Sequence, residues 1–157
     1  MLYRMHLKKI KYTCIQIIDQ ITFVFTGGIP SPTKGAYTGE AESEIYLPPD
    51  FSTGKVEFGL SYDTGDRKKI YMRGIRFYNR HEKLLEEIAG EEEEDETKTL
   101  QLLKNEKICG ARVAVYAYLP CEISFIMVTQ EPMADYQEEE DSDDRHNPWA
   151  KMESKKS

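Results

Sequence analysis

The chain has 157 residues, of which 39% are hydrophobic, 31% are charged and 11% are aromatic. That length fits one domain with a single hydrophobic core and short tails. No stretch approaches the roughly 18 consecutive apolar residues of a transmembrane helix. The charged N-terminus has no apolar segment behind it, so we expect neither a membrane span nor a secretory signal.

The formal net charge of −7 comes from two acidic runs rather than from the whole chain. Residues 91–96 and 138–144 hold 12 of the 28 acidic residues, which leaves 16 acidic residues against 21 basic ones. The runs repel phosphate and the remaining basic residues are spread along the chain, so we expect no nucleic-acid partner. We expect residues 91–96 to form a solvated acidic loop and residues 129–157 to form a disordered acidic tail.

The three cysteines, Cys14, Cys109 and Cys121, are an odd number in apolar, strand-like surroundings. No Cys-x-x-Cys pair and no Cys/His cluster at metal spacing is present, so we expect no metal site. Buried free thiols suit a reducing compartment, and we expect a cytoplasmic protein. One disulfide with a single remaining thiol is the alternative.

In chain order, β-branched and aromatic residues predict strands in residues 10–18 and 21–25, as two strands or one bent strand. The Gly- and Pro-rich residues 27–35 predict a loop. The order of Gly and Lys in this loop does not match a phosphate-binding loop. Residues 45–47 predict a short strand that two prolines end.

The clearest pattern is a predicted antiparallel hairpin. Residues 56–62 alternate apolar and polar side chains, as expected for a strand with one buried face and one wet face. Residues 69–79 also alternate, but the pattern slips by one position at Arg73 and Gly74. A bulge repairs such a slip, and glycine suits it. The second strand of the hairpin is therefore expected to contain a glycine bulge.

The remaining segments predict further strands. Residues 83–89 fit either a short helix or a strand, because periodicity does not decide between them. Residues 99–102 and 108–118 predict strands, and Pro120 is expected to end the second one. Residues 123–128 are nearly all apolar, so we expect this last strand to be central and covered on both sides.

These patterns together predict one all-β domain over residues 10–128, after an N-terminal extension of residues 1–9. We expect an antiparallel sandwich or β-prism of about seven to eight short strands. The patterns do not decide between the two.

Four short phrases in this domain resemble repeats of jacalin-related β-prism proteins. In chain order they are Gly-Ile-Arg-Phe-Tyr-Asn (74–79), Lys-Thr-Leu-Gln-Leu (98–102), Asn-Glu-Lys-Ile-Cys-Gly (105–110) and Ile-Ser-Phe-Ile-Met-Val (123–128). The resemblance covers residues 56–128 and implies a β-prism with a sugar site around a Gly-x-x-x-Asp loop near the end of the domain. Asp135 has no glycine four positions before it, so we assign no sugar-binding residue from the resemblance.

No set of residues in the sequence forms a catalytic constellation. His6 and His146 lie in the expected tails, and His81 follows the bulged strand among polar residues. No Gly-x-Ser-x-Gly elbow occurs. Paired carboxylates occur only in the acidic runs, which are too mobile to hold two catalytic carboxylates at a fixed separation. We therefore expect no enzymatic activity and no cofactor.

Tyrosine and arginine, which are enriched at protein interfaces, recur on the polar faces of the predicted strands. The candidate binding residues are Tyr71, Arg73, Arg76, Tyr78, Arg80, Arg112, Tyr116 and Tyr118. We interpret the chain as a protein-binding or assembly module, a subunit or docking domain of a larger complex. One alternative is a carbohydrate-binding module, which the same tyrosines would suit. A second is an acidic-tract chaperone whose acidic runs shield a basic client.

Overall fold

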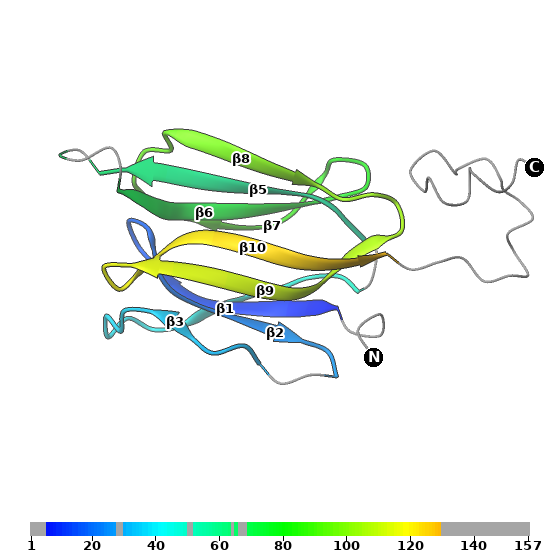
Figure 1. Cartoon of the computed structure of the whole chain (residues 1–157), viewed down its shortest axis with the longest axis horizontal. Helices are drawn as coiled ribbons and strands as arrows, with labels where there is room; N and C mark the ends of the chain where they lie inside the picture. The colour runs from blue at the N-terminus through cyan, green and yellow to red at the C-terminus, as the bar shows by residue number, and fades with distance from the viewer. Residues whose placement is uncertain (1–5, 28–29, 50–51, 64, 66–68, 130–157) are drawn as a thin grey trace, which may run out of the picture.

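Ten strands make up the described part of the chain, which is residues 6–27, 30–49, 52–63, 65 and 69–129 of the computed structural model. In chain order they are β1 (Leu7–Cys14), β2 (Ile18–Phe25), β3 (Lys34–Gly35), β4 (Ser43–Tyr46), β5 (Thr53–Tyr62), β6 (Ile70–Asn79), β7 (Leu84–Ala89), β8 (Glu96–Gln101), β9 (Glu106–Tyr116) and β10 (Leu119–Thr129). The strands run along the long axis of the molecule (Figure 1). No helix among the described residues is long and apolar enough to cross a membrane. The expected acidic tail lies, apart from Thr129, outside the described residues.

The strands form three antiparallel sheets. The first sheet has the order β3-β2-β1-β4, and the second has the order β7-β6-β5-β8. Each of these two sheets starts from a central hairpin, and the next two strands of the chain join its two edges. Within the described residues, the third sheet consists of the β9–β10 hairpin alone. Three sheets around one core form a β-prism, so the prism is confirmed over the sandwich.

The β5–β6 hairpin contains the predicted glycine bulge. Gly74 lies opposite Gly59, and Met72 lies opposite Leu60, so Arg73 is the extra residue. The bulge keeps Met72 buried in the core on one side of the slip while Gly74 approaches β7 closely. A Cβ atom at Gly74 would collide with the carbonyl oxygen of Ile88. Glycine is therefore required there for space.

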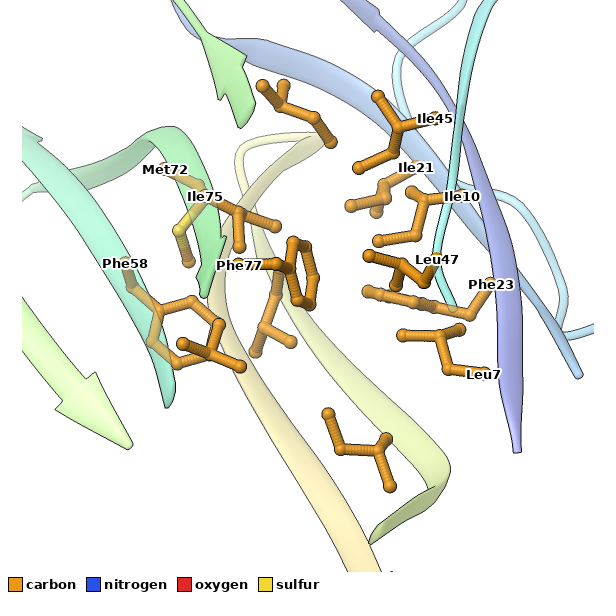
Figure 2. Close-up of a cluster of buried hydrophobic side chains, with 14 of the residues drawn as sticks. Leu7, Ile10, Ile21, Phe23, Ile45, Leu47, Phe58, Met72, Ile75 and Phe77 are labelled. Atoms are coloured by element: carbon orange, nitrogen blue, oxygen red, sulfur yellow. The ribbon is translucent and has the colours of Figure 1, made fainter. Parts of the chain in front are cut away.

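All three sheets contribute side chains to one core. Figure 2 labels those of the first two sheets. The ring of Phe125 on β10 lies 5.6 Å from that of Phe23 on β2, measured between centroids. It also lies 5.8 Å from the ring of Phe58 on β5 and 6.4 Å from that of Phe77 on β6. Such aromatic pairs add about 0.5–1.5 kcal/mol each beyond the burial of their area. Phe125 therefore ties the third sheet to the other two.

The structure decides the secondary structure of two segments for which the sequence allowed alternatives. Residues 10–25 form two strands, β1 and β2, which pair as a hairpin. β1 begins at Leu7, which is buried in the core. Residues 84–89 form the strand β7, which pairs with β6 from Tyr78 to Gly74. The alternation of buried Ile88 with exposed neighbours suits the edge of a half-buried sheet.

The expected end of a strand at Pro120 is wrong. β9 ends at Tyr116, a two-residue turn follows, and Pro120 is the second residue of β10. It lies opposite Val115, beside a register shift between Pro120 and Glu122. Proline is tolerated in a strand at such irregular positions, because fewer ladder hydrogen bonds need its missing N–H.

The expectation of a central last strand covered on both faces is also wrong. Ile123 is buried and Phe125 packs on the core, but Ile126 on the other face is 47% exposed. In a prism, each sheet has an inner face on the core and an outer face in solvent. An apolar run therefore does not show that both faces are covered.

Candidate functional site

The eight predicted binding residues lie on two different sheets. Five lie on β6 or directly after it, namely Tyr71, Arg73, Arg76, Tyr78 and Arg80. The other three lie on the β9–β10 hairpin, namely Arg112, Tyr116 and Tyr118. The two groups differ in what their side chains contact.

Arg76 is held by carboxylates of its own chain. Nη1 and Nη2 donate to the two carboxylate oxygens of Glu94, each at 2.9 Å. Nε donates to Glu57 at 2.9 Å. These hydrogen bonds hold the pKa of Glu94 at about 2, and they raise the pKa of Arg76. Bidentate arginine–carboxylate pairs are among the stronger hydrogen bonds in proteins, so this guanidinium is engaged within the chain.

Arg73 and Tyr78 are engaged in the same network. Arg73 Nε donates to the carbonyl oxygen of Glu92 at 2.9 Å, and Nη1 lies 3.4 Å from Glu94. The hydroxyl of Tyr78 donates to Glu57 at 2.9 Å. The two arginines therefore fasten the acidic loop to the outer face of the second sheet.

Arg80 and Tyr71 are also partly buried within the chain. Arg80 donates to the carbonyl oxygens of Leu102, Leu103 and Glu106 at 2.7–3.1 Å. Burial lowers the pKa of Arg80, and the residue holds the connection between β8 and β9. Tyr71 is half-buried on β6.

The acidic loop is only partly a solvated loop. Residues 91–93 are exposed, as expected. Glu94 is bound by Arg76, and the carboxylate of Asp95 accepts a hydrogen bond from the backbone N–H of Tyr62 at 2.8 Å. Glu96 is already the first residue of β8. The loop therefore has a definite position on the second sheet.

The same loop supports the turn between β1 and β2. The N–H of Glu91 donates to the carbonyl oxygen of Ile15 at 2.8 Å, and that of Glu92 donates to Gln16 at 3.0 Å. A Cβ atom at Gly90 would collide with the Gln16 carbonyl oxygen, so this close approach requires glycine. The β1–β2 turn is thus held in place by the acidic loop.

The turn between β9 and β10 has an unusual backbone. Ala117 and Tyr118 have φ angles of 53° and 68°. Two-residue hairpin turns with positive φ at both positions strongly favour Asn-Gly or Asp-Gly, because a side chain is strained there. Tyr118 is nevertheless 80% exposed, and Tyr116 before it is 54% exposed. Residues held in such conformations cluster at functional sites, so this turn is a candidate for one.

Several described connections lie at the same end of the prism, and three of them bear on the candidate site (Figure 1). They are residues 15–17 after β1, residues 90–95 before β8 and residues 117–118 after β9. We call this the loop end. It combines the exposed tyrosine of a strained turn with the exposed carboxylates of residues 91–93.

The described residues contain no group of three or more His, Cys, Asp or Glu side chains that could hold a metal ion. All three cysteines are free thiols in the structure; Cys109 is buried, and Cys14 and Cys121 are partly buried. Burial raises the pKa of Cys14 to about 11. Asp135, the residue compared with the family's sugar loop, lies outside the described residues.

Sequence reasoning missed the partners of the arginines and the turn of the last hairpin. Glu57 lies opposite Arg76 in the predicted hairpin, so this contact could have been found from the strand register. Glu94 lies on a later loop, and no short-range pattern links it to Arg76. Ala117 and Tyr118 carry no turn signal, so the alternation of β9 was extended through them. Only the structure shows that Tyr118 leaves the strand.

No protein-family model matches the chain, and no curated protein matches it. Solved structures do match its fold. A mannose-binding lectin from Champedak superposes with a TM-score of 0.61 at 16% identity, over 78% of this chain and 83% of that chain. The fold is that of jacalin-related lectins. Frutalin from Artocarpus incisa, in complex with galactose, gives a TM-score of 0.58 at 16% identity, over 78% and 92% of the two chains. Malaysian banana lectin gives 0.59 at 16% identity, over 80% and 84%.

These structures correct the functional expectation. The chain was interpreted first as a protein-binding or assembly module, but the similar structures named above are two lectins and a protein in complex with galactose. The arginines on β6 that carried that interpretation are bound within the chain. The findings favour the carbohydrate-binding alternative. Because the identity is low, the similarity establishes the fold, and the function is taken up below as a proposal.

Proposed function

We propose that this chain is a non-catalytic carbohydrate-binding protein whose site lies at the loop end and is centred on Tyr118. The observation that carries the proposal is the strained turn that displays this tyrosine. The similarity of the fold to lectins supports the same class of function.

The chemistry of the loop end suits a sugar. A pyranose ring has an apolar face of C–H groups, which packs against an aromatic ring, and a rim of hydroxyl groups, which need hydrogen-bond partners. Tyr118 offers an exposed ring with a polar hydroxyl. The carboxylates of the exposed residues 91–93 offer hydrogen-bond partners on the same end.

The charge of the loop end predicts the class of glycan. The carboxylates of residues 91–93 are exposed there, whereas Arg73 and Arg76 are engaged by Glu92 and Glu94. Exposed carboxylates repel sialylated and sulfated glycans. We therefore expect neutral sugars to be bound in preference to anionic ones.

A glycan array that carries neutral, sialylated and sulfated glycans tests this proposal. We expect the wild-type chain to bind a subset of the neutral glycans and Tyr118→Ala to lose about 1–3 kcal/mol of binding free energy, as for a buried aromatic contact. Tyr46→Ala is the matched control, because Tyr46 is also exposed (53%) but lies on β4. The proposal is wrong if the wild-type chain binds no glycan. It is also wrong if the two tyrosine variants behave alike.

A further inference from the structure

The acidic loop connects the outer face of the second sheet to the loop end. On one side, Arg76 holds Glu94 through two hydrogen bonds of 2.9 Å. On the other side, the N–H groups of Glu91 and Glu92 hold the β1–β2 turn. Only Glu93 separates Glu92 from Glu94, so a displacement of Glu94 acts on the segment that bonds the turn, a segment that Arg73 also holds at Glu92 and Ser61 at Glu93.

Arg76 is itself anchored independently of this loop. Its Nε donates to Glu57 on β5 at 2.9 Å, so the guanidinium is oriented by the sheet before it meets the loop. The backbone of Arg76 lies in the β5–β6 ladder, where it is paired with Glu57. The guanidinium therefore has a fixed orientation where it meets the loop, whose residues 91–94 lie outside the strands and whose ends, Gly90 and Asp95, donate to backbone carbonyl oxygens of the sheet.

We propose that Arg76 is a positioning residue for the sugar site: by holding Glu94, it sets the position of the acidic loop and of the β1–β2 turn at the loop end. This inference rests on the proposed carbohydrate-binding function. Arg76 touches no ligand in this arrangement, because its donors face Glu94 and Glu57. It acts on binding through Glu94.

The first test compares Arg76→Leu, Arg76→Lys and the control Lys98→Leu. Lys98 lies on β8 of the same sheet, and its side chain is 65% exposed. The probes are polyacrylamide polymers that carry mannose or galactose, immobilised for binding measurements. We expect Arg76→Leu to weaken binding about tenfold, which lies in the usual range of coupling between sites, and Lys98→Leu to change it less than about twofold. Arg76→Lys keeps the charge but loses the fork, so its loss should be intermediate.

A double-mutant cycle with Glu94→Gln tests the route. If Arg76 acts through Glu94, the double variant should bind no more weakly than the single variant with the lower affinity. If the two residues act independently, the losses of affinity should multiply in the double variant.

Hydrogen exchange provides a readout without sugar. The amides of Glu91 and Glu92 should exchange at least about tenfold faster in Arg76→Leu, because their protection depends on the loop staying closed. Amides in the β9–β10 ladder should be unchanged.

The outcomes separate the two proposals. If the wild-type chain binds neither polymer nor any arrayed glycan, the carbohydrate-binding function fails and the inference falls with it. If the wild-type chain binds but Arg76→Leu binds equally well, the positioning role is wrong and the function stands. Faster exchange without weaker binding also overturns the positioning role, because the loop would then move without affecting the site.

Discussion

The outer face of β6 and the tip of the β9–β10 hairpin carry the same kinds of residue, but the two regions use them differently. On β6, Arg73, Arg76 and Tyr78 donate to carboxylates and carbonyl oxygens of neighbouring segments. At the hairpin tip, Tyr116 and Tyr118 are mostly exposed, and Tyr118 is held in a strained conformation. Residues of interface type therefore do not mark a site by themselves. What matters is whether their contacts are already made within the chain.

The largest effect on stability is expected on β6, at the glycine bulge. Gly74→Ala should lower the free energy of unfolding by about 2–4 kcal/mol, because the new Cβ would meet the backbone of Ile88 and the sheet would have to shift. Gly65→Ala is the control. At Gly65, a Cβ would have only an ordinary contact of 3.5 Å with Asp63, so we expect a change below about 0.5 kcal/mol.

Urea denaturation of both variants measures this difference. Similar midpoints for Gly74→Ala and Gly65→Ala would show that the bulge is not rigid. The outer face of β6 would then not be more rigid than the tip of the β9–β10 hairpin, and the comparison between them would be wrong.

A smaller effect is expected from the ion pairs on β6, and it should depend on pH. The pKa of Glu94 is lowered to about 2 in the folded state, chiefly by hydrogen bonds from Arg76. A group with a lowered folded pKa stabilises the protein fully above its ordinary pKa, and this stabilisation is lost as the pH falls toward 2. After allowance for solvent screening, Glu94→Gln should cost about 1–2 kcal/mol at pH 7.

The matched control is Glu91→Gln, from the same acidic run, since Glu91 is exposed. Thermal unfolding at pH 7, 5, 4 and 3 should show a gap between wild type and Glu94→Gln that narrows below about pH 4.5. Glu91→Gln should match wild type throughout. A gap that is constant with pH would mean that the Glu94 charge is not what holds the loop.

The two regions also differ in how well the sequence predicts them. The β5–β6 hairpin and its bulge follow from the alternation of residues 56–62 and 69–79, because a buried face requires a period of two and a slip requires a bulge. Strand pairing between neighbours in sequence is local information. The pairing of Arg76 with Glu94 crosses a loop whose path the sequence does not determine, so the arginines were interpreted as free for a partner.

The tip of the last hairpin was missed for a different physical reason. Turns are predicted from residues that relieve backbone strain, such as Gly, Asn and Asp. Ala117 and Tyr118 bear positive φ angles without such relief. Turn-prediction rules assume that residues with positive φ are ones that adopt it easily, so they do not predict a strained turn such as this one. The same feature makes the tip a place where a substitution by glycine is expected to raise stability.

The last prediction uses this property of the tip. Tyr118→Gly should raise the free energy of unfolding by about 1 kcal/mol, because glycine adopts positive φ without a steric cost and the exposed ring gives up little packing. The control is Tyr116→Gly, two residues earlier and still within β9. At this position glycine should lower the free energy of unfolding by about 0.5–1 kcal/mol, because a strand residue does not need the wider range of backbone angles that glycine allows.

Urea denaturation should thus give shifts of opposite sign for the same substitution. In the glycan array, Tyr118→Gly should lose binding although it is the more stable protein. If Tyr118→Gly is instead less stable than wild type, the Tyr118 ring packs against the chain. The tip would then resemble β6, where the side chains already have their contacts within the chain.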